Sequence, residues 1–137
     1  MKTLIALAAA LTAVVATLPI ASAAVADAKP VVVIKAPKFG SILATRGHVA
    51  LYTWKQEKAG TVRCTGECAK EWPPLTVPKG TMVARHVMGA MGTFGTIKRA
   101  DGRTQVTLNG RPLYTYVGDT RTKILCDGVN GWFVVRA

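Results

Sequence analysis

Two cysteines four residues apart are the first residues of this sequence that could do chemistry. Cys64 and Cys68 stand in the segment "CTGECAKEWPPL", followed by a tryptophan and two prolines. A pair with this spacing can ligate a metal such as zinc, or it can close a disulfide across one helical turn. Because an oxidising compartment favours the disulfide, the location of the protein bears directly on the choice.

The first 23 residues have the three parts of a secretory signal peptide. Met1 and Lys2 form a short positive start, residues 4–20 are almost entirely apolar, and Ala21-Ser22-Ala23 offers small residues for cleavage. We therefore expect a signal peptide at 1–23 and a periplasmic or secreted protein, with no stable membrane insertion after cleavage. This location favours a disulfide over a thiolate metal site.

The composition of the remaining chain indicates one basic domain. Removing 23 of the 137 residues leaves 114, which suffices for a single domain with a modest core. Without Lys2, 17 of the 18 basic residues remain against 7 acidic residues, a net charge near +10. This excess favours anionic envelope components or another envelope protein as partners. Nucleic acid is not expected, because the basic residues are dispersed without interleaved aromatic residues.

The pattern after the signal peptide is that of a mainly β protein. Residues 24–40 are expected to form an N-terminal tail that leads into a first strand, and 41–137 a single domain. Asp101-Gly102 and Asn109-Gly110 separate alternating segments and suit the tight turns of an antiparallel meander. One or two helical turns are expected between Cys64 and Trp72, ended by the prolines that follow.

The chain aligns with itself at an offset of 62 residues. "LYTWKQEKAGTVRC" from Leu51 matches "LYTYVGDTRTKILC" from Leu113 without a gap. The alignment places Tyr52 on Tyr114, Glu57 on Asp119 and Cys64 on Cys126. The sequence therefore predicts duplicated antiparallel β-meander units that share one core, with repeat 1 at about 41–75 and repeat 2 at about 94–137.

These stretches resemble a family of bacterial secreted-repeat proteins, often lipoproteins, named for a repeated Tyr-x4-Asp motif. The matching segments are "ALYTW", "CTGECAKEWPPLTVPKG", "GTFGTIKRADGRTQVTLNGRPLYTYVGD" and "DGVNGWFVV". The resemblance implies export and a repeated β fold, and it implies little about activity. The chain departs from the family pattern at Glu57, which replaces the motif aspartate, and at Cys126, which the usual pattern lacks.

The cysteine pairing has two solutions. A Cys64–Cys68 disulfide closes a short loop and matches the paired cysteines that the resemblance implies, so it is the pairing we predict. A Cys64–Cys126 disulfide would instead join the two repeats through equivalent positions. Either solution leaves one odd thiol, and with the first pairing Cys126 is expected to stay reactive.

The tyrosine and carboxylate of each motif suit a structural role. Residues five apart on a strand face opposite ways, so Tyr114 can meet Asp119 only if the chain turns, which Gly118 permits. We expect Asp119 to accept a hydrogen bond from Tyr114, with Tyr52 and Glu57 as a weaker copy. The alternative is that these side chains line a small cleft for a cation or another ligand.

Candidate residues for catalysis are scarce, and the sequence indicates a protein that is not an enzyme. Ser41 is the only serine after residue 23, and neither a Gly-x-Ser-x-Gly nor a His-Glu-x-x-His pattern occurs. We predict an exported structural or binding module of unknown ligand, without a cofactor. The alternative is a periplasmic protein that handles copper or haem.

The possible metal ligands of that alternative are dispersed along the sequence: His48, His86, Met88, Met91 and Cys126. The methionines of "MVARHVMGAM" are expected instead to fill gaps in a loop and in the core.

Overall fold

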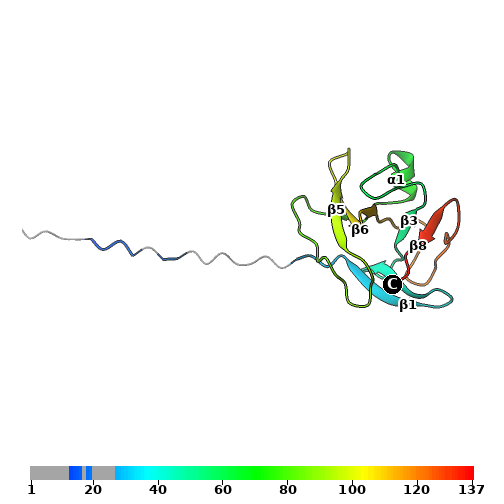
Figure 1. The fold of residues 1–137 in the computed structure, drawn as a ribbon, viewed down its shortest axis with the longest axis horizontal. Helices are drawn as coiled ribbons and strands as arrows, with labels where there is room; N and C mark the ends of the chain where they lie inside the picture. Colours follow the sequence, from blue (N-terminus) through cyan, green and yellow to red (C-terminus); the bar gives the residue numbers. More distant parts are fainter. Residues whose placement is uncertain (1–12, 17, 20–26) are drawn as a thin grey trace, which may run out of the picture.

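The computed structural model describes residues 13–16, 18–19 and 27–137, so most of the expected signal peptide lies outside the described residues. The domain is mainly β, as predicted, with antiparallel sheets and one short helix (Figure 1). Its elements are β1 (Val31–Ala36), β2 (Gly40–Thr45), β3 (Tyr52–Trp54), α1 (Glu67–Glu71), β4 (Thr76–Val77), β5 (Phe94–Lys98), β6 (Thr104–Leu108), β7 (Arg111–Pro112) and β8 (Trp132–Val134). No helix among the described residues is long and apolar enough to cross a membrane.

The folded domain begins earlier in the chain than the sequence indicated. β1 lies within the expected tail of 24–40 and forms an antiparallel hairpin with β2, with Ile34 opposite Ile42. Val31 is only 2% exposed and packs with the buried Leu43. The boundary at residue 41 is therefore wrong by about ten residues, because the valine-rich segment before it is a core strand.

A second hairpin repeats this arrangement later in the chain. β5 and β6 pair antiparallel with Ile97 opposite Gln105, and β4 and β7 extend the sheet along β6. Asn109 and Gly110 adopt φ angles of 50° and 79° between β6 and β7, as expected for a tight turn. The hairpin β5–β6 thus corresponds to the hairpin β1–β2.

The short helix forms where the sequence placed it. α1 covers Glu67–Glu71, and Trp72 caps it by donating its backbone N–H to the carbonyl oxygen of Cys68. Pro73 and Pro74 follow directly and end the helix, because a proline has no N–H to continue the hydrogen-bond ladder.

The two halves have the same pattern of backbone hydrogen bonds. Around the first hairpin, three backbone N–H groups donate to three carbonyl oxygens in a triangle. Leu43 donates to Val135, Val135 to Leu51, and Leu51 to Leu43, each at 2.9 Å. The second half repeats this triangle with Val106, Leu75 and Leu113, at 2.8–3.0 Å. Tyr52 and Tyr114 exchange both backbone hydrogen bonds, at 2.8 and 3.0 Å. The duplication read from the sequence is therefore present in the backbone.

Each half contributes strands to the sheet of the other half. β3 pairs with β8, so that Tyr52 lies opposite Val134 and Trp54 opposite Trp132 (Figure 1). In the equivalent place, Pro74 forms a bridge with Tyr114. The buried side chains form two clusters, and both draw on residues from the two halves. The expected shared core is therefore built by exchange between the repeats.

Candidate functional site

The motif tyrosines pair with the carboxylates of the opposite repeat. The hydroxyl of Tyr114 donates to Glu57 Oε1 at 2.7 Å, and the hydroxyl of Tyr52 donates to Asp119 Oδ2 at 2.5 Å. The expected pairing of Tyr114 with Asp119, and of Tyr52 with Glu57, is therefore wrong. Because Tyr52 and Tyr114 pair across the boundary between the halves, each phenol points toward the loop of the other half.

Each motif carboxylate also ties down the loop that follows it. Glu57 Oε1 accepts the backbone N–H groups of Arg63 and Cys64, at 2.7 and 3.0 Å. Asp119 Oδ1 accepts the N–H of Leu125 at 2.9 Å. Each carboxylate therefore has the same role: it accepts a tyrosine hydroxyl of the other half and a backbone N–H of its own loop. Glu57 is the more buried of them, with 2% of its surface exposed. Its Oε2 has no hydrogen-bond partner among the described residues.

Burial and the nearby carboxylates change the acidity of these groups. The pKa of Tyr52 and that of Tyr114 are raised well above the ordinary value, first by burial and then by the hydrogen bond to Asp119 or Glu57. Burial also raises the pKa of Asp119, against the lowering effect of its hydrogen bonds from Tyr52 and Leu125. Both phenols therefore remain neutral donors at physiological pH.

Three tryptophan rings stack across the boundary between the halves, and a tyrosine ring packs against them at an angle. Trp72 and Trp132 lie face to face at its centre, with ring centroids 3.9 Å apart and planes 6° apart. Trp54 stacks on the outer face of this pair beside Trp132, and Tyr116 packs against Trp72. The motif tyrosines complete the cluster, since Tyr52 and Tyr114 meet Trp72 and Trp132 edge to face. The motif residues thus belong to a packed aromatic core, which supports their structural role.

The cysteines adopt the predicted pairing. Cys64 and Cys68 form a disulfide with their Cα atoms 5.2 Å apart, and Cys126 is a free cysteine. Cys126 is 9% exposed, and burial raises the pKa of its thiol. Its thiol and Cys68 line one hollow, beside Tyr116 and Trp132. A buried thiol with a raised pKa has little thiolate at neutral pH, which argues against the expected reactivity.

The possible metal ligands lie in three different places. His48 lines a hollow beside the β1–β2 hairpin, His86 and Met88 line another, and Cys126 lines the hollow next to the disulfide. The expectation that the methionines fill gaps is wrong for the side chains of Met82, Met88 and Met91, which are 73–96% exposed. The structure therefore does not bring the five candidate ligands together.

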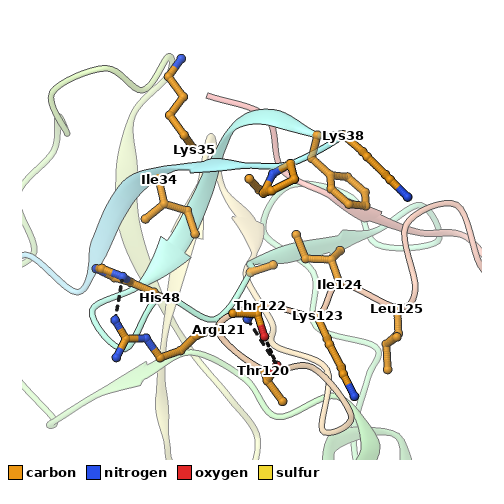
Figure 2. Close-up of a pocket in the computed structure, with 14 residues that line it drawn as sticks. Ile34, Lys35, Lys38, His48, Thr120, Arg121, Thr122, Lys123, Ile124 and Leu125 are labelled. Atoms are coloured by element: carbon orange, nitrogen blue, oxygen red, sulfur yellow. Dashed lines mark hydrogen bonds between the residues drawn. The ribbon is translucent and has the colours of Figure 1, made fainter.

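A basic hollow with apolar walls lies between the β1–β2 hairpin and residues 120–125 (Figure 2). Its volume is about 320 Å³, and 14 residues line it. The sequence pattern does not predict this hollow, because the basic residues that line it lie in separate segments of the chain: Lys35, Lys38, Arg121 and Lys123. Only the folded chain brings these side chains around a single cavity.

Comparison with known proteins finds one family model that matches part of the chain. Residues 95–136 match the model of the family Lipoprotein_15, a secreted repeat of unknown function. The matched segment runs from β5 to just beyond β8 and so covers about one repeat. No curated protein and no solved structure matches the chain. The resemblance to a secreted-repeat family is thus confirmed, and it indicates an extracellular or envelope location.

Proposed function

We propose that the protein is an exported, non-enzymatic module that binds a polyanionic component of the cell envelope. The observation that carries this proposal is the unbalanced positive charge of the folded domain. Residues 24–137 include 17 basic and 7 acidic side chains.

Most of the acidic side chains are already engaged within the fold. Glu57 and Asp119 accept hydrogen bonds from the core tyrosines. Three more carboxylates form four ion pairs, and the basic partners are Lys70, Arg99, Arg103 and Arg136. Within residues 27–137, the remaining lysines and arginines therefore have no carboxylate within 4.0 Å. Their charge is available to a partner from outside the chain.

A polyanion suits this distribution better than a catalytic substrate does. The positive side chains are spread over several elements, so they can contact successive charges of a polymer rather than one reacting group. The two most buried carboxylates, Glu57 and Asp119, hold loops and phenols of the scaffold. The exchanged strands and the stacked rings supply a firm scaffold for such a surface.

The test is retention of the purified domain on immobilised polyphosphate, with neutral dextran as the control. We expect retention on polyphosphate only, weakening steeply as salt rises from about 50 to about 500 mM, because added ions screen exposed charges. A variant with Lys55, Lys58 and Lys79 changed to glutamine should elute at lower salt. Equal retention on dextran, or retention that ignores salt, would contradict the proposal.

A further inference from the structure

We propose that the hollow beside the β1–β2 hairpin is a binding site for a small ligand that joins one anionic group to an apolar body. This inference concerns a discrete cavity and does not depend on binding of a polyanion. Its volume of about 320 Å³ lies at the lower end of the range typical of ligand pockets.

The walls of the hollow are apolar. Ile34 projects into it from β1, and Ile124 projects toward it from the opposite loop (Figure 2). Phe39 and Ala50 also line it, and both isoleucines pack onto the buried aromatic cluster. The lysines at its edge, Lys38 and Lys123, extend away from this apolar centre (Figure 2). A ligand in the hollow would therefore bury an apolar body and keep its charge at the edge.

The charged side chains that line the hollow are basic. One arginine, one histidine and three lysines line it, and no carboxylate is among the described lining residues. Arg121 Nη2 lies 3.5 Å from His48 Nδ1, and the hydroxyls of Thr120 and Thr122 lie 3.4 Å apart on the same loop. Arg121 has no carboxylate within ion-pair distance in the described part of the chain. The guanidinium of Arg121 is suited to a carboxylate, sulfonate or phosphate group.

Comparison of the two halves shows why this hollow is open. Because Leu43 and Val106 occupy equivalent places in the backbone triangles, the strand registers make Ala36 equivalent to Arg99 and Ile42 equivalent to Gln105. The sequence alignment at an offset of 62 residues, which holds from Leu51 onward, makes Cys126 equivalent to Cys64.

In the second half, a side chain fills the corresponding space. Arg99 is 2% exposed and reaches from the β5–β6 hairpin to the end of the opposite loop. There its Nη2 donates to the carbonyl oxygen of Cys64 at 2.8 Å, while Nη1 donates to Gln105 Oε1 at 2.7 Å. In the first half, Ala36 is too short to span this gap and Ile42 offers no polar partner. The same space in the fold is therefore filled by an arginine side chain in the second half and left open in the first.

The far wall of the hollow is held in a fixed shape. Asp119 closes the loop by accepting the N–H of Leu125, and Thr120 donates its N–H to the carbonyl oxygen of Lys123 at 3.1 Å. Asp119 is itself held by the hydroxyl of Tyr52. The motif of the second repeat therefore positions one wall of the proposed site, which reduces the ordering that a ligand must cause.

The test uses three probes in isothermal titration calorimetry. Naphthalene-2-sulfonate has both required parts, naphthalene-2-sulfonamide is a neutral analogue of the same shape, and inorganic sulfate lacks the apolar body. We expect the sulfonate to bind at least about tenfold more tightly than either of the others. Equal binding of the sulfonamide would overturn the anionic requirement, and equal binding of sulfate would overturn the apolar one.

Variants then locate the site. Combining Ala36→Arg with Ile42→Gln copies the second half and should abolish sulfonate binding, although it adds a positive charge. Retained binding in a folded double variant would overturn the proposal. The double variant should still be retained on polyphosphate. Loss of sulfonate binding at the cavity can therefore be told apart from loss of the proposed polyanion binding.

A second comparison applies even if the double variant does not fold. Arg121→Gln should weaken sulfonate binding by about tenfold or more. Lys58→Gln removes the same charge from the equivalent loop of the other half, at an exposed position, and should have little effect. Equal weakening by the two substitutions would show that only the overall charge matters, and would overturn the proposed site.

Discussion

The exchanged tyrosine–carboxylate pairs predict a specific pattern of energetic coupling. Tyr114→Phe removes one of the three donors that Glu57 Oε1 receives, and it leaves a carboxylate that is only 2% exposed with fewer partners. Loss of a hydrogen bond that strands a buried polar group costs about 1–3 kcal/mol of unfolding free energy. Tyr52→Phe should cost less, because its partner Asp119 is less buried than Glu57.

Double-mutant cycles identify the partners. Tyr114→Phe combined with Glu57→Ala should lose less stability than the sum of the single changes, by about 1 kcal/mol, because each change strands the group that the other removes. Tyr52→Phe with Asp119→Ala should couple in the same direction. Tyr114→Phe with Asp119→Ala should instead be additive within about 0.5 kcal/mol, since the two side chains share no hydrogen bond.

The assay is urea denaturation at one fixed pH, followed by tryptophan fluorescence. Only variants with an unchanged dependence of free energy on urea are compared, so that the values refer to the same transition. Coupling of Tyr114 to Asp119 as large as its coupling to Glu57 would refute the exchanged pairing.

Three further outcomes follow from the buried groups. The pKa values of Tyr52 and Tyr114 are raised in the folded protein, so above pH 10 the unfolded chain releases these protons while the folded chain keeps them. Stability should therefore fall by about 1 kcal/mol per tyrosine between pH 10 and 11. Alkaline melting curves should show this loss, and Tyr52→Phe should reduce it. Cys126 should react with a thiol reagent at least about tenfold more slowly in the folded protein than in urea, because burial raises its pKa; equal rates would contradict this. Trp72→Ala should cost about 3–5 kcal/mol in urea denaturation, because Trp72 touches both Trp132 and Tyr52 in the core; a cost below about 1 kcal/mol would contradict this.

The repeat visible in the sequence predicted which residue types correspond, but not which of them make contact. Spacing within one repeat suggested that Tyr114 meets Asp119, because the two lie close in the chain. The backbone pairing of Tyr52 with Tyr114 decides otherwise, and this contact between distant segments has no local signal. By contrast, the helix end at Pro73 and the turn at Asn109-Gly110 follow from local chemistry, and both were predicted.

The first strand and the basic hollow were missed for a related reason. The gapless alignment at an offset of 62 holds from Leu51 onward, whereas the hairpin β1–β2 matches β5–β6 at an offset of 63. A single-residue shift between the hairpin and the motif therefore concealed the start of the first repeat. With a gap of one residue in the self-alignment, Ala36 aligns with Arg99. The difference in the size of these two side chains then predicts a cavity beside Ala36.

The exchange of strands and hydroxyls has a consequence for any isolated repeat. A single copy would carry a phenol and a carboxylate that cannot satisfy one another, together with a strand whose pairing partner lies in the missing half. Two such copies could restore the exchanged tyrosine–carboxylate pairs and the strand pairing by associating head to head, as the two halves do within this chain. The repeat is thus a unit of sequence duplication but not a unit of folding. A polypeptide with an odd number of copies would need a second polypeptide to complete the last copy.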